Sequence, residues 1–318
     1  MSVTIRNYRD EDLQAVVEVI NAADSVDQLD EATSVARLRQ RLGQPDFDPY
    51  RDVFVATDED AHVVGHARLE LDTGPEQSFF YTTPTVHPDW REQGIERQLL
   101  ERLWKRAHER RRDLRSSRVY FHAYCAVHQT VTVALFESFG LQPMRYSPYM
   151  VCQPLDNLAQ PQLPPGIEVR PYVQGQDDQS ALKTLNESFA DDWEFVPTTM
   201  ETLIYWTASS TFRAELSRVA LDGDEVIGLC LCTVSEDRFK RLGRRDGHVN
   251  VLAVRPPYGR RGLGSALLLT CLHALKRAGM ESATLDTDID NPTQAMSLYE
   301  RVGFREVWRW VTYGREIQ

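Results

Sequence analysis

The sequence predicts an α/β protein in which one fold occurs twice along 318 residues. A short apolar strand, a glycine-rich turn and a long apolar helix follow one another over residues 250–274, as in several nucleotide folds. Motifs recur at a fixed offset, since Gly228 lies 163 residues after Gly65. Residues 154–166 carry four prolines and are typical of a linker. A repeat over the whole chain indicates a tandem duplication.

The two copies begin with the same order of elements. Residues 3–8 alternate between apolar and polar side chains like a strand, and residues 167–172 repeat this pattern. An acidic helix start follows each strand, and a hairpin follows later at residues 53–65 and 218–228. We therefore predict domains over residues 1–153 and 167–318.

Composition limits the classes of function. Hydrophobic residues make up 42% and charged residues 26% of the chain, as in soluble globular proteins. A net charge of −11 argues against a nucleic-acid binder and against anionic membrane surfaces. The first twelve residues are too polar for a signal peptide, and no apolar run is long enough to span a membrane. Five cysteines complete no zinc site, so we expect structural thiols in a cytoplasmic protein.

The glycine-rich turn has the chemistry of a phosphate site. It reads Gly259-Arg260-Arg261-Gly262-Leu263-Gly264-Ser265 and precedes a helix that begins near Leu263. Glycine lets a ligand approach the backbone, and the first N–H groups of a helix point outward. The helix dipole and the two arginines favour anions at the same place. We interpret the turn as a pyrophosphate site; the alternative is an ordinary strand–helix corner.

The spacing of the turn distinguishes among nucleotide folds. A dinucleotide fingerprint would read G-x-G-x-x-G near the start of the unit, and a Walker loop would need a lysine before Ser265. The turn instead resembles the (Gln/Arg)-x-x-Gly-x-(Gly/Ala) motif of the GNAT acetyltransferases, although Gly259 stands where Gln or Arg is usual. This resemblance implies acetyl-CoA as cofactor, with backbone amides contacting its pyrophosphate.

A second stretch, residues 291–304, carries the same resemblance. From Ala295 onward it fills the GNAT pattern A-x-x-L-Y-x-x-x-G-F, and Asn291 precedes Ala295 by four residues, one more than the family spacing N-x-x-A. Asn291 can cap a helix over residues 292–301, and Gly303 can end it. The resemblance implies that Tyr299 protonates the departing CoA thiolate. Asn291 as a plain cap and Tyr299 as a core aromatic form the alternative.

The fold class that follows is α/β (α+β): two tandem GNAT folds, each a mixed, mostly antiparallel twisted sheet flanked by helices. The chain resembles, in architecture, the tandem type of this family to which mycothiol synthase belongs, in which the C-terminal copy is catalytic. Backbone groups of the strand before the turn then contact the cofactor arm. The predicted cofactor-binding residues are Leu252, Ala253, Val254, Gly259, Arg260, Arg261, Gly262, Leu263, Gly264, Ser265, Asn291 and Tyr299.

The first copy keeps the spacing of the motifs but lacks several of the residues that cofactor binding and proton transfer need. Its turn begins with Arg91, but Glu96 stands where the second copy has Gly264. A carboxylate beside a diphosphate lowers affinity. The counterparts of Asn291 and Tyr299 are His128 and Phe136, and Phe136 has no proton to give. We expect a degenerate, structural N-terminal domain; a cofactor bound there without turnover is the alternative.

The proton acceptor is expected near the start of the strand before the turn. His248 lies eight residues before Pro256, where similar sequences carry a glutamate, and a histidine titrates near neutrality. His248 as a surface residue is an equal alternative, and Glu236 and Asp246 are further candidates for the base.

An acidic and aromatic segment, residues 186–197, is the candidate acceptor site. Its predicted substrate-binding residues are Asp191, Asp192, Trp193 and Phe195. Carboxylates among aromatic rings suit a small cationic amine through ion pairs and cation–π contacts. A helix-capping loop is the alternative.

The leading hypothesis is an acetyl-CoA-dependent N-acetyltransferase that acts on a small-molecule amine by direct attack in a ternary complex. A non-catalytic acyl-CoA sensor and a mycothiol-synthase-like enzyme are the alternatives. The basic run 106–118 is interpreted as a helix end and not as a nucleic-acid site. We expect a monomer or weak homodimer that needs no metal and contacts neither nucleic acid nor membrane.

Overall fold

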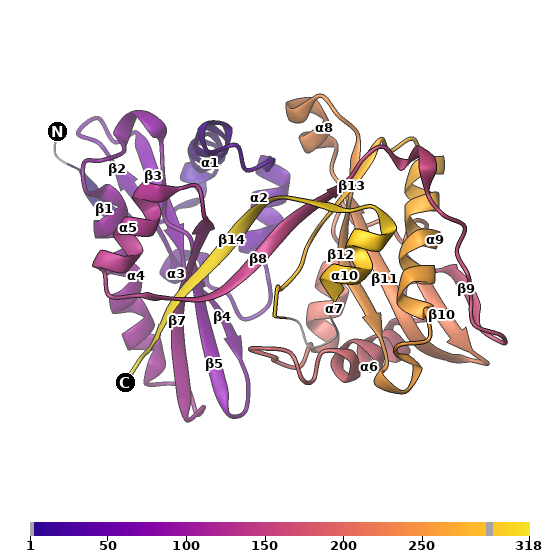
Figure 1. The fold of residues 1–318 in the computed structure, drawn as a ribbon. Coiled ribbons are helices and arrows are strands. Elements are labelled where there is room, and N and C mark those ends of the chain that lie inside the picture. The colour runs from indigo at the N-terminus through magenta and orange to yellow at the C-terminus, as the bar shows by residue number, and fades with distance from the viewer. Residues whose placement is uncertain (1–2, 291–294) are drawn as a thin grey trace. The chain divides into compact units, whose positions relative to one another are not determined.

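The computed structural model describes residues 3–290 and 295–318. It contains two compact units, one of residues up to Tyr146 together with Trp310–Gln318, the other of Ser147–Arg309. In Figure 1 each unit combines helices with twisted strands.

The second unit is built on a mixed, mostly antiparallel sheet. Its order is β8, β13, β12, β11, β10, β9, and only β12 and β13 among these strands run parallel. The strands are β8 (Gln142–Cys152), β9 (Glu168–Pro171), β10 (Arg218–Asp222), β11 (Glu225–Val234), β12 (Asp246–Val254) and β13 (Ser282–Asp286). The helical elements are η3 (Leu155–Asn157), α6 (Asp178–Ser188), α7 (Met200–Thr207), α8 (Glu236–Leu242), η4 (Pro256–Tyr258), α9 (Leu263–Arg277) and α10 (Ala295–Val302).

The first unit divides its strands between two sheets. One has the order β1, β2, β3, β6, and the other places β4, β5, β7 and β14 side by side, with β5 and β7 parallel. The strands are β1 (Thr4–Asn7), β2 (Val53–Thr57), β3 (Val63–Arg68), β4 (Glu70–Thr73), β5 (Gln77–Thr82), β6 (Thr85–Val86), β7 (Arg118–Ala126) and β14 (Arg305–Glu316). The helical elements are η1 (Asp10–Asp12), α1 (Leu13–Asp27), α2 (Val35–Leu42), α3 (Pro49–Asp52), η2 (Pro88–Trp90), α4 (Ile95–Arg111) and α5 (Thr130–Ser138).

Two strands depart from the predicted domain limits. The last residues of β8 pair with β13 in the second unit, whereas Trp310–Glu316 of β14 pair with β7 in the first. The second unit therefore begins at Ser147, and the C-terminal residues complete the first unit. The segment predicted as linker also contributes to packing, because Leu155 is buried in the core of the second unit.

Equivalent side chains make equivalent bonds in the two units. Arg6 donates two hydrogen bonds to Asp12, each 2.7 Å long, and Arg170 does the same to Asp177. In each unit one asparagine also exchanges two bonds with the backbone of the residue before the second helix cap. The pairs are Asn21 with Thr33 and Asn186 with Thr198. Since Asn186 lies 165 residues after Asn21, these contacts support the duplication seen in the sequence.

Glycine brings the central helix of each unit close to its sheet. A Cβ on Gly228 would lie 2.9 Å from Leu267 Cδ1 of α9, and a Cβ on Gly65 would lie 3.4 Å from Leu99 Cδ1 of α4. Both distances are short for a carbon contact, so each hairpin glycine makes room for the helix.

Each unit has a core on both faces of its strands. In the second unit α9 and α10 cover one face with Leu267, Leu272 and Tyr299, and α6 and α7 cover the other with Leu185 and Leu203. This two-sided burial matches the long apolar pattern of α9, which the sequence predicted to begin at Leu263.

Several sequence features have structural roles. Arg106 and Arg110 of the basic run both donate to the buried Asp52, each at 2.8 Å, so these two arginines serve the first unit's packing. All five cysteines are buried, and none forms a disulfide. Among the described residues no helix is long and apolar enough to cross a membrane.

Candidate active site

The turn before α9 leaves backbone amides pointing outward. Gly259 donates back to Pro256, at 3.1 Å, and Gly262 has a φ of 82°. Within the described residues, the N–H groups of residues 260–265 make no hydrogen bond. The side chains of Arg260 and Arg261 are exposed at the same place, while that of Leu263 is buried in the core. The core therefore fixes the helix start, and its amides face solvent with two cations beside them.

Gly264 lets the first turn of α9 pack closely against two neighbouring elements. A Cβ on Gly264 would lie 3.2 Å from Leu298 Cδ1 of α10 and 3.8 Å from Val254 Cγ2 of β12. A larger side chain would therefore crowd these two residues. The unpaired amides and the positive charge beside them fit a diphosphate.

The two parallel strands of the second unit separate where the thioester would lie. β12 pairs with β13 from Asp246–Ser282 to His248–Thr284, and no further pair joins them within the described residues. β12 stays paired with β11 as far as Val254. The other edge of β12, which carries Leu252, is therefore open to an extended ligand arm.

Tyr299 extends from α10 into the core beside Phe304, with 6.0 Å between ring centroids. Its hydroxyl makes no hydrogen bond to the described part of the chain. Burial raises the pKa of Tyr299 well above its usual value, and the nearby Cys230 and Asp192 add to the rise. Tyr299 therefore stays protonated at neutral pH and can donate a proton. Gly303, whose N–H donates to Tyr299 O at 3.1 Å, ends the helix as predicted.

Asn291, the first residue of the second motif, lies outside the described residues. The described part of α10 begins at Ala295.

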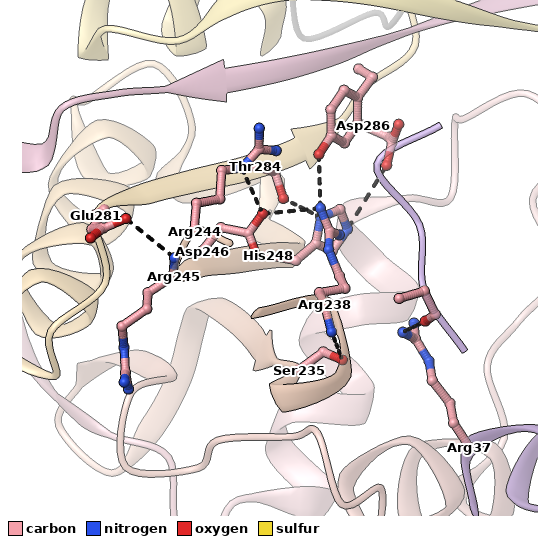
Figure 2. Close-up of polar contacts among 12 residues, drawn as sticks. Arg37, Ser235, Arg238, Arg244, Arg245, Asp246, His248, Glu281, Thr284 and Asp286 are labelled. Atoms are coloured by element: carbon pink, nitrogen blue, oxygen red, sulfur yellow. Dashed lines mark hydrogen bonds and ion pairs between the residues drawn. The ribbon is translucent and has the colours of Figure 1, made fainter. Parts of the chain in front are cut away.

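His248 lies at the last register pair before β12 and β13 separate. Figure 2 shows its ring beside Thr284 and Asp286. The distance from His248 Nδ1 to Thr284 Oγ1 is 2.9 Å, and Nε2 lies 3.9 Å from Asp286 Oδ2. Neither Thr284 nor Asp286 was predicted from the sequence to lie beside His248. Thr284 and Asp286 lie two residues apart on a strand and therefore share one face, which is the sequence signal that could have identified them.

The two further candidates for the base differ in environment. Asp246 is buried and accepts hydrogen bonds from Arg238, at 3.1 Å, and Arg244, at 3.4 Å. This carboxylate therefore serves an ion-pair network with arginines (Figure 2). Arg238 also donates a hydrogen bond to the Tyr149 hydroxyl. Glu236 is exposed in the first turn of α8.

The candidate acceptor residues lie in the loop between α6 and α7. Asn186 closes this loop through its bonds to Thr198. Asp191 and Trp193 are exposed, and Phe195 N–H donates to Asp192 O at 3.2 Å. Asp192 is close enough to raise the pKa of Tyr299. The loop thus reaches the tyrosine through Asp192, while the roles of its other side chains stay predictions.

The corresponding turn of the first unit is engaged by the protein itself. Arg91 donates to both carboxylate oxygens of Asp27, at 2.7 and 2.8 Å, and Gln129 donates to the same carboxylate at 2.8 Å. His128 Nε2 lies 2.8 Å from Asp27 O. Burial raises the pKa of Glu96, which accepts a bond from its own N–H. Arg91 and the Glu96 amide are therefore occupied, and the sequence did not reveal that Asp27 holds Arg91.

A separated pair of parallel strands, followed by a helix start with outward amides, defines an acyltransferase of the acyl-CoA-dependent class. Two family descriptions match the chain: "Acetyltransferase (GNAT) family" over residues 182–304 and "Acetyltransferase (GNAT) domain" over residues 49–142. The chain belongs to the GNAT family of acetyltransferases, with two such domains in tandem.

Relatives and solved structures extend this comparison over the whole chain. The mycothiol acetyltransferase of Thermobifida fusca is 32% identical over 95% of this chain and 93% of its own length. That of Streptomyces griseus is 31% identical over 92% and 88%. A GCN5-related N-acetyltransferase from Sphaerobacter thermophilus superposes with a TM-score of 0.78 at 23% identity, covering 99% of this chain and 96% of that one. A tandem GNAT protein of the clavulanic acid pathway gives 0.71 at 15% identity, over 99% and 98%.

Proposed function

We propose that the chain transfers the acetyl group of acetyl-CoA to the primary amine of a small cationic acceptor, and that the second unit carries this reaction. The observation that carries the proposal is the open edge of β12 between His248 and Val254, directly before the outward amides of residues 262–265. In the first unit the corresponding turn is held by Asp27.

The cofactor would be held by backbone groups and two cations. The amides of Gly262, Leu263, Gly264 and Ser265 would bind the pyrophosphate, with Arg260 and Arg261 beside it. The edge of β12 at Leu252, Ala253 and Val254 would align the pantetheine arm. When bound, acetyl-CoA supplies the activated acyl carbon. Asn291 is proposed for the same site from the sequence motif alone.

Two side chains would move the protons of the reaction. The acceptor amine forms a bond to the acyl carbon, and His248 takes the proton that this nitrogen loses. The bond from the acyl carbon to sulfur breaks, and Tyr299 gives a proton to the sulfur. Solvent restores both side chains. Glu236 is the reserve candidate for the base and Asp246 is disfavoured, since its carboxylate is held by two arginines.

The loop between α6 and α7 would bind the acceptor. Asp191 and Asp192 would pair with its positive charge, and the rings of Trp193 and Phe195 would enclose it. The nearness of Asp192 to Tyr299 supports this placement.

Two other functions remain candidates. The relatives named mycothiol acetyltransferase favour the deacetylated precursor of mycothiol as acceptor, although His248 and Gly259 depart from the residues typical of mycothiol-synthase-like sequences. An acyl-CoA sensor would bind the cofactor without turnover.

A panel of primary amines separates these functions. Purified protein would be given acetyl-CoA with spermidine, tyramine, glucosamine, cysteine methyl ester or deacetylated mycothiol, and release of free CoA thiol would be followed. Turnover with a cationic amine supports the proposal, and turnover with deacetylated mycothiol alone supports the alternative acceptor. Calorimetric binding of CoA without turnover on any amine would indicate a sensor.

A further inference from the structure

The ring of His248 lies between two side chains of β13 (Figure 2). Nδ1 is 2.9 Å from Oγ1 of Thr284, a hydrogen-bond distance, and Thr284 is fully buried. Nε2 is 3.9 Å from Oδ2 of Asp286, whose side chain is 40% exposed. This second distance exceeds that of a hydrogen bond but still allows an ion pair. The two ring nitrogens therefore lie beside different groups, Nδ1 beside a hydroxyl and Nε2 beside a carboxylate.

The other charged groups on this side of the sheet come from β12, from α8 and from the loop between them. On β12, Asp246 lies on the same strand face but is held by Arg238 and Arg244. On α8, Arg238 also donates to Tyr149 of β8 at 3.0 Å, and Glu236 is exposed. The adjoining part of β11 offers the uncharged Thr233, and α9 packs on the opposite face, where a Cβ on Gly247 would strike Leu275.

Building on the proposed function, we propose that Thr284 and Asp286 are positioning residues for His248. Thr284 accepts a hydrogen bond from Nδ1–H and so selects the tautomer whose Nε2 carries the lone pair. Nε2 then accepts the proton that the amine loses when the bond between its nitrogen and the acyl carbon forms. The Asp286 carboxylate stabilises the resulting imidazolium.

Nuclear magnetic resonance of the ¹⁵N-labelled imidazoles tests this arrangement without cofactor or acceptor. A His248→Gln variant assigns the signals of His248. We expect the Nδ1–H tautomer in the unaltered chain and a mixed population in Thr284→Val, with Thr284→Ser restoring the first pattern. In Asp286→Asn the titration of His248 should move to lower pH by about 0.5 to 1 unit, since a partly exposed carboxylate no longer favours the cation.

Kinetics with the most active amine of the panel provide the second readout. Asp286→Asn should move the acid limb of the kcat/KM profile to lower pH by the same amount, and Thr284→Val should lower kcat by about tenfold. Asp286→Glu keeps a carboxylate, so its pH profile should lie close to that of the unaltered chain. Glu168→Gln, which removes a carboxylate from the opposite edge strand β9, is the matched control and should move neither.

An unchanged His248 titration in Asp286→Asn, or an unchanged tautomer in Thr284→Val, would overturn the inference. A rise in KM for Asp286→Asn with an unshifted pH profile would also overturn it, because the carboxylate would then bind the acceptor. Full activity of His248→Gln would show that His248 is not the base. Thr284 and Asp286 could then have no effect on catalysis through it. If the unaltered chain transferred no acetyl group, the proposed function would fail while the resonance experiment still reported on the side-chain arrangement.

Discussion

Tyr299 combines two properties that a proton donor to a thiolate requires. Its burial keeps the hydroxyl protonated at neutral pH, and within the described residues this hydroxyl is not committed to another group. Its place on α10 follows from the motif, because Gly303 ends that helix one turn later. The residue is thus held by the fold while its hydroxyl is left for chemistry.

Replacing Tyr299 by Phe should lower kcat by about a hundredfold, because general-acid catalysis contributes on that order. Acetyl-CoA affinity should stay within about twofold, since the ring and its packing on Phe304 are kept. CoA release and calorimetry would measure the two quantities. Tyr50→Phe, at an exposed tyrosine of the first unit, is the control. Unchanged turnover in Tyr299→Phe would show that another group protonates the sulfur.

We expect the turn before α9 to determine why the second unit binds acetyl-CoA and the first does not. Gly264→Glu introduces the residue type that the first unit has at position 96, and we expect the acetyl-CoA dissociation constant to rise by at least about tenfold through bulk and like charge. Gly264→Gln should have a smaller effect, because it adds bulk without charge. Equal effects of the two variants in calorimetry would mean that charge plays no part.

The converse substitution, Glu96→Gly, should leave acetyl-CoA binding unchanged. The Arg91 side chain and the His128 ring remain tied to Asp27 in that variant. A second binding event in the same titration would show that Glu96 alone had blocked the first unit.

The contact between β11 and α9 makes a prediction about stability. Gly228→Ala places a Cβ 2.9 Å from Leu267 and 3.1 Å from Ala253 O, so we expect the free energy of unfolding to fall by about 1–3 kcal/mol. Gly43→Ala, whose Cβ would meet atoms no closer than 3.5 Å, is the matched control with little change. Urea unfolding measures both, and equal stability of the two variants would contradict the close approach.

Local patterns predicted most elements and failed at long-range pairing. The strand before the turn and the helix from Leu263 follow from apolar periodicity, and both are present. The pairing of β14 with β7 was not predictable, because the pattern of a strand does not identify its partner. The same reason applies to Asp27 and Asp286, whose partners lie 64 and 38 residues away along the chain. Such partners are brought together only by the fold.

At the scale of the whole molecule, duplication has kept the frame in both units and altered the site in one. In each unit an arginine of the first strand pairs with an aspartate that follows it, Arg6 with Asp12 and Arg170 with Asp177. This arginine–aspartate clamp has the same geometry in both units. The turn before the helix differs, since Arg91 of the first unit is paired with Asp27, whereas Arg260 and Arg261 of the second unit are exposed. We infer that packing constrained the clamp in both copies, whereas the proposed cofactor chemistry constrained the turn in one.

The clamps predict a pH dependence of stability. Burial alone would raise the pKa of Asp177, but the bonds from Arg170 and the Val173 amide outweigh it and lower the pKa below its usual value of 3.8. The clamp therefore stabilises the fold above that pH, and its contribution is lost as the pH falls below about 4. Arg170→Gln should cost about 2 kcal/mol at pH 7 and less at pH 3. Arg6→Gln, acting on Asp12, should behave alike, and a deficit that grew on acidification would contradict this assignment.

A crystal structure with acetyl-CoA tests the proposed site most directly. The pyrophosphate should lie on the amides of residues 262–265, with the thioester beside Leu252 and its sulfur within hydrogen-bond reach of the Tyr299 hydroxyl. Acetyl-CoA bound instead at Gly94, with the second turn empty, would contradict the assignment of the catalytic unit.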